Sequence, residues 1–367
     1  MVKSSQPDTF RVSRSTARVL GNGHPWILPD AESDDPARFR PGSRVRVLGP
    51  TDRELGWARI EGPGRIAARM WARAGSSPRD DGGEVWDRVQ AALARREPLA
   101  ARGSARNRVN GRIYTDALRL IHGEADGLPG LTVDRLGPLL RVGVWGGACA
   151  DLLGPVVNAL RKQLDTPEGG IWPVVEVRSK PLAVAAGQAA VSWREPPPPS
   201  WMREHVGDQS RVKVWERGLC FEVDPGLSAA DHPRPGVGLF LDQRENRARL
   251  ARRARRGGTW LNLFAHTGSF SLALLAGGAE QVRSVDLSAA YLRWLEGNLE
   301  LNREELLDAS RHVSIRQDGR RYLASLPRAE QFAGIVLDPP TAASAGRRFW
   351  SIRRDLEPLV GECLKRL

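Results

Sequence analysis

The segment TWLNLFAHTGSFSLALLAGGAEQVRSVD, residues 259–286, decides the fold of the C-terminal part of this chain. It begins with an apolar stretch, 259–264, that has the length and composition of a buried strand. A turn containing Gly268 follows, then an apolar helix over 269–276 and a second strand over 282–286. This order predicts two parallel strands joined by a right-handed crossover.

The alternation of strands and helices continues on both sides of this unit. Helices are expected over 243–256, 289–301, 320–326 and 353–367, strands over 312–316 and 332–337, and a hairpin from strands 212–216 and 220–223. The pattern therefore predicts an α/β domain whose parallel sheet carries helices on both faces.

Two further regions precede this domain and differ from it in pattern. Residues 1–75 contain short strands without helical periodicity, which indicates a small β-barrel, and residues 76–195 predict an α+β module. The proline run 196–199 is expected to be a stiff spacer, so the α/β domain is placed at 196–367. The predicted fold class is multidomain, with α+β and α/β parts. Expected strands lie over 44–48, 55–60, 65–71, 117–122, 131–134, 139–145 and 171–177, and expected helices over 85–96 and 152–164.

Polar side chains follow the first two strands of the parallel sheet, where open α/β sheets bind their ligands. The cofactor-binding residues expected after the first strand are Asn262, Phe264, His266, Thr267 and Gly268. Asp286 ends the second strand, where a carboxylate can accept hydrogen bonds from ribose hydroxyls. A dinucleotide-binding loop has three glycines that let the backbone approach a pyrophosphate, and this loop has one. The single glycine favours S-adenosyl-L-methionine over a nicotinamide cofactor.

Two later strand ends add to the predicted site. Asp318 and Gly319 follow the third strand, where a carboxylate can bind the adenine amino group, and the alternative for Asp318 is a helix N-cap. Asp338 follows the fourth strand and is the catalytic candidate, with Pro339 and Pro340 fixing the backbone beside the substrate. His266 is expected to bind or pack rather than to act as a base.

Charge and cysteine content narrow the class of protein. The chain has 55 Lys and Arg against 43 Asp and Glu, a net charge of +12, which favours a polyanionic partner. A merely basic enzyme is the alternative. The N-terminus lacks a signal-peptide pattern and no apolar run is long enough to span a membrane. The three cysteines lie far apart, which predicts neither disulfides nor a metal site, and indicates a cytoplasmic protein.

Several longer motifs together resemble one family. They are His24-Pro25-Trp26, GEADGLPGLTVDR over 123–135, GLFLDQR over 238–244, Asn262 to Phe270, Asp286 and Asp338-Pro339-Pro340. The chain resembles the bacterial ribosomal large-subunit methyltransferases that modify carbon 5 of a cytosine. The resemblance implies an RNA-binding PUA domain at 1–75, a central module at 76–195 and a Rossmann-like methyltransferase domain at 196–367. It also implies 23S ribosomal RNA as partner, S-adenosyl-L-methionine as cofactor, and Gln243 and Arg244 near the cofactor.

The family pattern also implies further strands and a catalytic cysteine after Leu367, so the sheet is expected to be C-terminally incomplete after its fourth strand. A thiolate adds to carbon 6 of the cytosine so that carbon 5 can attack the methyl donor. Cys363 is a poor candidate for that thiolate, since it lies within the last predicted helix. Three alternatives therefore stay open: methylation of an exocyclic amine of ribosomal RNA, a noncatalytic RNA-binding relic, and a nicotinamide-dependent oxidoreductase. The sequence also leaves a homodimer open.

Overall fold

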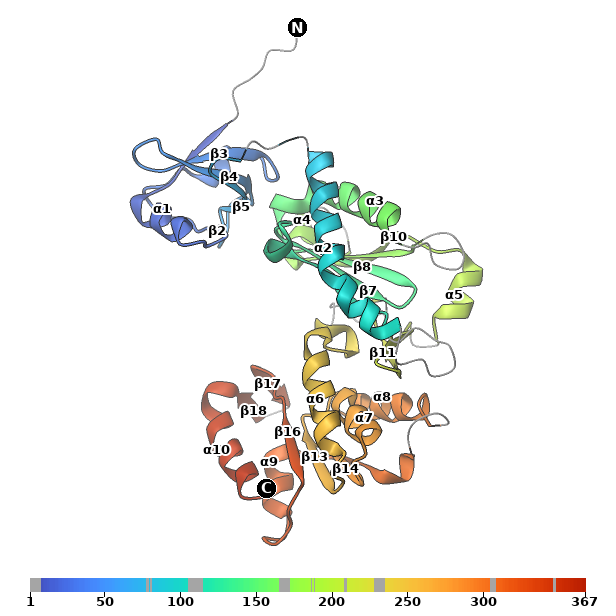
Figure 1. The fold of residues 1–367 in the computed structure, drawn as a ribbon. Coiled ribbons are helices and arrows are strands. Elements are labelled where there is room, and N and C mark those ends of the chain that lie inside the picture. Colours follow the sequence, from blue (N-terminus) through green and yellow to red (C-terminus); the bar gives the residue numbers. More distant parts are fainter. Residues whose placement is uncertain are drawn as a thin grey trace. The chain divides into compact units, whose positions relative to one another are not determined.

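The computed structural model describes residues 8–76, 79, 81–104, 115–164, 172–185, 187, 189–207, 210–227, 235–303, 308–345 and 348–367. The chain divides into two compact units, which Figure 1 shows in sequence colours. Unit 1 comprises Met1–Ala105, Ala117–Gly207 and Pro225–Pro233, and unit 2 comprises Arg106–Asp116, Asp208–Asp224 and Arg234–Leu367. The proline run 196–199, which was expected to mark a domain boundary, lies within unit 1. The three domain ranges expected from the sequence stay a prediction.

The first sheet of unit 1 has the strand order β1-β3-β4-β5-β2. Its strands are β1 (Thr9–Arg11), β2 (Trp26–Ile27), β3 (Arg44–Leu48), β4 (Glu54–Ile60) and β5 (Ala68–Arg73). A helix that the sequence analysis did not predict, α1 (Arg14–Gly21), begins after Ser13, whose Oγ accepts a hydrogen bond from the Thr16 N–H. Helix α1 has only eight residues, most of them polar or small, and only Leu20 is buried, so its sequence gives a short and weak helical signal.

The second sheet of unit 1 has the order β10-β9-β8-β7-β6. Its strands are β6 (Ala117–His122), β7 (Leu131–Leu136), β8 (Leu139–Val144), β9 (Val174–Arg178) and β10 (Val191–Glu195). The accompanying helices are α2 (Asp81–Ser104), α3 (Leu153–Gln163), α4 (Lys180–Ala185) and α5 (Pro199–His205). Apolar residues of α2 and α3 pack with those of β6, β7 and β8 in one core, so these two helices cover one face of the sheet.

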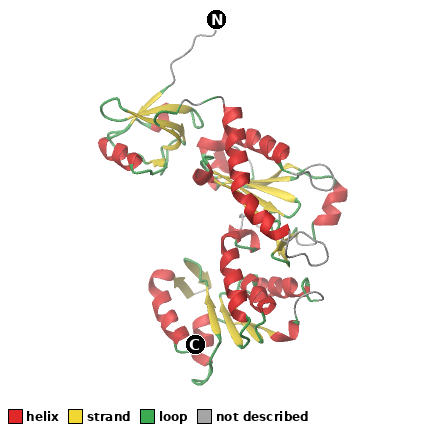
Figure 2. Cartoon of the chain, viewed as in Figure 1, coloured by secondary structure: helices red, strands yellow, loops and turns green. Residues whose placement is uncertain are grey.

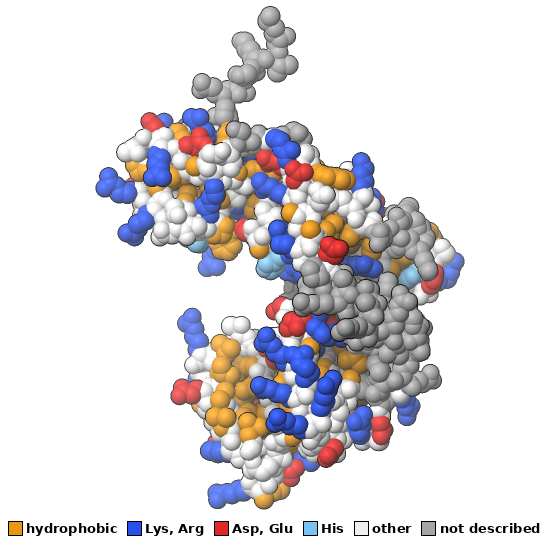
Figure 3. Space-filling view, viewed as in Figure 1, with side chains coloured by type: hydrophobic (Ala, Val, Ile, Leu, Met, Phe, Trp, Pro, Cys, Tyr) orange, Lys and Arg blue, Asp and Glu red, His pale blue; other side chains and the backbone are white. Residues whose placement is uncertain are grey.

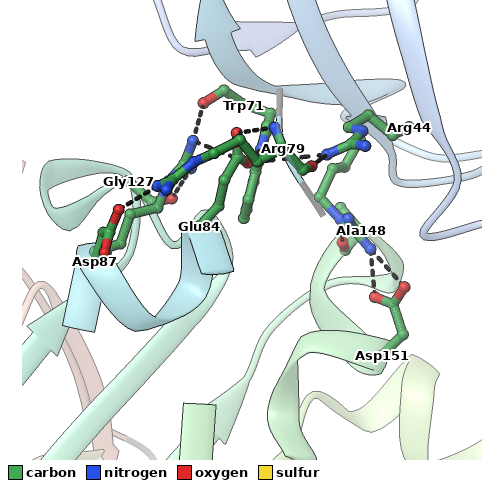
Figure 4. Close-up of polar contacts among 10 residues, drawn as sticks. Arg44, Trp71, Arg79, Glu84, Asp87, Gly127, Ala148 and Asp151 are labelled. Carbon is green, nitrogen blue, oxygen red and sulfur yellow. Dashed lines mark hydrogen bonds and ion pairs between the residues drawn. The ribbon is translucent and has the colours of Figure 1, made fainter. Parts of the chain in front are cut away.

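Polar contacts join the first sheet of unit 1 to the second (Figure 4). The Arg59 guanidinium on β4 is buried; it donates to the Ala148 carbonyl at 2.8 Å and pairs with Asp151. Arg88 on α2 donates to the carbonyls of Trp71 and Gly127. Because a buried guanidinium is costly without partners, these bonds fix how the two sheets of unit 1 meet.

Unit 2 contains a four-stranded parallel sheet of order β15-β14-β13-β16, with helices on both faces (Figure 2). Its strands are β13 (Thr259–Leu263), β14 (Gln281–Asp286), β15 (His312–Arg316) and β16 (Gly334–Leu337). The helices are α6 (Arg244–Ala254), α7 (Ser269–Gly277), α8 (Ala289–Glu300), α9 (Gly319–Ser325) and α10 (Ile352–Leu364). Two hairpins complete it, β11 (Val212–Glu216) with β12 (Leu219–Val223), and β17 (Ala342–Ala345) with β18 (Arg348–Ser351). The second hairpin was not predicted, because each of its strands has four residues and β17 contains only small side chains, which give no alternating apolar pattern.

Candidate functional site

The four parallel strands of unit 2 end at one edge of their sheet, and most of the site residues expected from the sequence lie there. Leu263, Asp286, Arg316 and Leu337 are the last residues of β13, β14, β15 and β16. The turn 264–268, the residues after β15 and the Asp-Pro-Pro segment therefore share this edge. Parallel strands predict such a meeting of strand ends, because their carboxyl ends all point the same way.

The turn after β13 has an unusual backbone. Phe264, His266 and Gly268 have φ values of 57°, 51° and 80°, and the first two are not glycines. At Gly268 a Cβ atom would lie 2.3 Å from Leu295 Cγ, so only glycine fits between the turn and α8. Thr267 is fully buried, its hydroxyl donates to the Gly238 carbonyl, and Gly268 then begins α7. The turn is thus held tightly against neighbouring elements.

Asp286 fastens this turn to the end of β14. Its Oδ2 accepts from the His266 N–H at 2.9 Å and its Oδ1 accepts from the Ser288 N–H at 2.8 Å. Burial raises the pKa of the Asp286 carboxyl, and the backbone hydrogen bonds from Ser288 and His266 offset part of that shift. Each carboxylate oxygen has a second acceptor position, so the group can still bind hydroxyls of a ligand.

Asn262 lies on β13 beneath the turn and is buried. Its amide donates to Ser271 Oγ at 2.8 Å, so its side chain joins β13 to α7. Asp318 and Gly319 lie after β15, and Asp318 caps α9 by accepting from the backbone N–H groups of Arg320 and Arg321. The N-cap alternative for Asp318 is therefore present in the structure.

Asp338 lies directly after β16 and is exposed, as is Pro340, while Pro339 is half-buried. Although the residue as a whole is exposed, neighbouring atoms partly desolvate its carboxyl, and this and the nearby Asp242 raise the pKa of Asp338, while Arg247 opposes the shift. The Pro340 carbonyl accepts from Trp350 Nε1 at 2.7 Å, which anchors the segment to β18. The carboxylate therefore projects from a fixed backbone.

Gln243 and Arg244 lie at the start of α6, in the stretch that resembles the family's entry to its catalytic domain. Gln243 accepts through Oε1 from the Asn246 amide at 2.7 Å. Arg244 is buried, 3.5 Å from Glu216, and burial lowers the pKa of its guanidinium. Arg247, one turn further along α6, makes two 2.7 Å hydrogen bonds to Glu216 and donates to the Phe240 carbonyl.

Sequence reasoning missed several residues at this edge. The His266 ring lies 4.3 Å from the Tyr291 ring and 5.5 Å from that of Phe240, measured between centroids. Asp242 and Arg247 both act on the charge of Asp338. Phe240 and Asp242 are part of the quoted GLFLDQR motif, so that motif was the available signal for them.

A groove of about 1230 Å³ runs between α6 and β16 and includes Gln243 and Asp338. Its α6 side carries Arg249, Arg252, Arg253 and Arg256, and its other side is the β16 strand. Figure 3 shows basic side chains gathered beside apolar ones on unit 2. The groove brings cationic side chains up to the edge that holds Asp338.

Two structural features are absent from the described residues. No group of three or more His, Cys, Asp or Glu side chains among them is arranged to hold a metal ion. Within the same residues, no helix combines the length and apolar character that crossing a membrane requires. The three cysteines, Cys149, Cys220 and Cys363, are buried.

Comparison with known proteins identifies the chemistry of the C-terminal part. Residues 193–349 match the S-adenosylmethionine-dependent methyltransferase family. Ribosomal RNA large subunit methyltransferase I of Salmonella arizonae is 30% identical over 344 residues, which cover 93% of this chain and 77% of that protein. A ribosomal RNA large subunit methyltransferase of Deinococcus radiodurans is also 30% identical, over 91% of this chain and 75% of its own length.

Solved structures share the fold. SMU.776, crystallised in complex with SAH, superposes with a TM-score of 0.74 at 21% identity, covering 98% of this chain and 83% of that one. A SAM-dependent methyltransferase structure from Streptococcus mutans gives a TM-score of 0.72 at 20% identity, with the same coverage. The likeness extends across both units of the chain.

Proposed function

The chain belongs to the ribosomal RNA large subunit methyltransferases, which use S-adenosylmethionine, and on this premise we propose that it methylates carbon 5 of a cytosine in large-subunit (23S) ribosomal RNA. The observation that carries the proposal is the meeting of the Gly268 turn, Asp286 and Asp338 at one sheet edge in a chain 30% identical to such enzymes. We place its action in the cytoplasm.

The residues at the edge fit the methyl donor. Gly268 lets the turn pack closely on Leu295 of α8, and Asp286 keeps acceptor positions for ribose hydroxyls. Phe264 and His266 flank the same turn, and Gln243 and Arg244 lie at the start of α6. S-adenosylmethionine, when bound, supplies a methyl group on a sulfonium that a nucleophilic carbon can attack. The protein's part is to hold this group in line with the base and to exclude water.

Asp338 is the proposed group that contacts the base. A partly desolvated carboxylate with a raised pKa accepts a hydrogen bond from the amino group of cytosine. Pro339 and Pro340 remove backbone freedom at this point, and Trp350 fixes the Pro340 carbonyl. Together they would position the ring for methyl transfer.

Methylation of carbon 5 needs a nucleophile for carbon 6, and the three thiols of this chain are poorly placed for it. Cys363 lies in the core between α10 and the sheet, and burial raises the pKa of its thiol to about 11. Cys220 is buried on β12, and Cys149 belongs to unit 1. Reaction at carbon 5 therefore requires a nucleophile other than these, whereas reaction at an exocyclic amine requires none.

The identity of the product tests the proposal. Purified chain is incubated with S-adenosylmethionine and ribosomal RNA from cells that lack the gene, and the RNA is digested to nucleosides for mass spectrometry. We expect 5-methylcytidine. N-methylated guanosine or adenosine would replace the carbon 5 proposal with the amine alternative, and no methylation by a chain that binds S-adenosylhomocysteine would support the noncatalytic relic.

Calorimetry tests the cofactor site directly. Asp286→Asn leaves the His266 or the Ser288 N–H facing an amide donor and removes the charge that strengthens hydrogen bonds to ribose. We expect affinity for S-adenosylhomocysteine to fall by about tenfold or more, equivalent to about 1.4 kcal/mol. Glu300→Gln makes the same charge change on the exposed surface of α8 and should leave affinity unchanged. Binding of NADH but not of S-adenosylhomocysteine would overturn the assignment.

We also propose that residues 1–75 form a PUA-like RNA-binding domain and residues 76–195 a central module. The support is the five-stranded first sheet and the His24-Pro25-Trp26 motif that leads into β2. A cationic chain with net charge +12 is suited to a phosphate-rich partner. Deletion of residues 1–75 should weaken binding to ribosomal RNA more than binding to S-adenosylhomocysteine, and equal loss of both would contradict this role.

A further inference from the structure

The second sheet of unit 1 has one face that α2 and α3 do not cover, and part of it carries polar and aromatic side chains. The register pairs His122 with Thr132 and Thr132 with Gly143, so these three residues form a row across β6, β7 and β8. Side chains in such a row point to the same side of a sheet. Leu131 and Val133, which alternate with Thr132, belong to the core beneath α2 and α3. The row therefore lies on the opposite face.

Trp145 lies over this row with its ring in a fixed position. Its Nε1 donates to Thr132 Oγ1 at 2.8 Å, and its backbone N–H donates to the Gly130 carbonyl at 2.9 Å. A Cβ on Gly143 would lie 2.7 Å from Nε1 and 2.8 Å from Cε2 of the indole. The ring thus rests on a glycine that leaves room for it. The side chain is nonetheless 41% exposed, so an indole surface faces solvent.

The adjoining row on the same face carries a partly exposed guanidinium. Arg119 pairs with Asp134 in the next row on the same face, at 2.6 Å. The Arg119 side chain is 37% exposed, but that of Asp134 is 5% exposed. His122, which is exposed, lies 3.2 Å from the Arg119 guanidinium. This row therefore offers a cation to solvent while its own carboxylate is hidden.

We propose that this face of the central sheet binds an unpaired nucleotide of the RNA substrate, with its base stacked on Trp145 and its phosphate beside Arg119. The inference rests on the proposed function, which supplies RNA as the partner. A flat aromatic ring that is exposed and immobile, next to a cation, is suited to a nucleobase and its phosphate. A protein partner would instead favour a wider apolar surface, and the neighbours in the row, His122 and Thr132, are polar.

Anisotropy of a fluorescent twelve-residue oligouridine tests the stacking. Trp145→Ala should weaken binding at least about fivefold, whereas Trp145→Phe, which keeps an aromatic ring, should retain most of it. Gly143→Ala should act like Trp145→Ala, because the new methyl group displaces the indole. Trp86→Ala is the matched control: Trp86 is 37% exposed on α2, a helix that covers the other face, and its loss should have no effect.

Calorimetry with S-adenosylhomocysteine and thermal melting separate the outcomes. If Trp145→Ala melts like the original chain, binds S-adenosylhomocysteine normally and loses RNA affinity, the stacking site is supported. If the original chain binds the oligouridine and Trp145→Ala binds it equally well, the site is refuted while the proposed function stands. If the original chain binds neither RNA nor S-adenosylhomocysteine, the proposed function fails and this inference with it. Equal losses for Trp145→Ala and Trp86→Ala would also refute the site.

Discussion

Acid should weaken the parallel sheet of unit 2 through one imidazole, that of His312. This residue begins β15, and its Nε2 lies 2.7 Å from Ser284 Oγ on β14. Ser284 is in turn bonded to Ser271 at 2.7 Å, and Ser271 accepts from the Asn262 amide at 2.8 Å. Burial lowers the pKa of His312 from 6.5 to about 4, because a charged imidazole is poorly solvated there. One polar chain thus links the edge strand to the residue beneath the cofactor turn.

Acid destabilises the folded state because His312 binds its proton more tightly in the unfolded chain than in the folded one. The unfolded state holds the proton up to pH 6.5 and the folded state only below about pH 4. Full stability is therefore present above pH 6.5 and is lost as the pH falls from 6.5 toward 4. At pH 5 the loss covers about 1.5 pH units at about 1.36 kcal/mol each, or about 2 kcal/mol in the free energy of unfolding.

His312→Gln isolates this contribution, since glutamine keeps a polar group near Ser284 but does not titrate. Urea unfolding is followed at pH 7.5 and at pH 5 by hydrogen exchange. The exchange is read from peptides that span β14 and β15, so the urea midpoint refers to this sheet alone. The original chain should lose about 2 kcal/mol more than the variant between the two pH values. His122→Gln, which removes an exposed imidazole from unit 1, is the control.

The reasoning is refuted if the original chain and His312→Gln lose the same free energy of unfolding, within about 0.5 kcal/mol, between pH 7.5 and pH 5. Equal losses would mean that the folded state binds the proton as readily as the unfolded chain. They would also mean that the bond between Ser284 and His312 tolerates the charged imidazole.

Two substitutions test how the site is held in unit 2. Gly268→Ala should destabilise the unit by about 2–4 kcal/mol and abolish S-adenosylhomocysteine binding, because its Cβ would meet Leu295 at 2.3 Å and its φ is positive. Gly297→Ala on α8 has open space around it and should be neutral or stabilising by up to about 1 kcal/mol, so equal losses at the two glycines in urea titration would contradict the steric argument. Arg247→Met should cost about 3–5 kcal/mol, because the buried Glu216 loses both of its 2.7 Å hydrogen bonds and keeps only Arg244 at 3.5 Å, and adding Glu216→Leu should restore part of that loss. A double variant less stable than Arg247→Met alone would show that the charge is not the cause.

The sequence predicted the parallel sheet of unit 2 and the position of its strand ends well. The apolar run of β13, the single glycine after it and Asp286 at the end of β14 are signals local in sequence. Parallel topology then brings them to one edge without any knowledge of side-chain contacts. The same logic placed Asp338 there, because the residue following β16 joins that edge once β16 pairs with β13.

Other features depend on contacts that no local pattern reveals. Helix α1 has eight residues and one buried side chain, so its sequence pattern is too short to stand out. The pairing of Arg247 with Glu216 joins elements 31 residues apart, and both are charged types that usually face solvent. Neither helix propensity nor residue spacing predicts that this ion pair is buried. It is shielded from water only because α6 packs against the β11 hairpin.

In the turn 264–268, Asp286 has a structural role in addition to the ligand contact proposed for it, and a simple substitution cannot separate the two. Phe264 and His266 both have positive φ, which costs about 1–2 kcal/mol at each residue. The turn keeps this conformation because Asp286 accepts from the His266 N–H and the Asn298 amide donates to the Thr267 carbonyl. The carboxylate that would bind the ribose therefore also shapes the turn that receives the rest of the cofactor. A loss of ligand affinity in Asp286→Asn therefore combines a lost contact with a loosened turn.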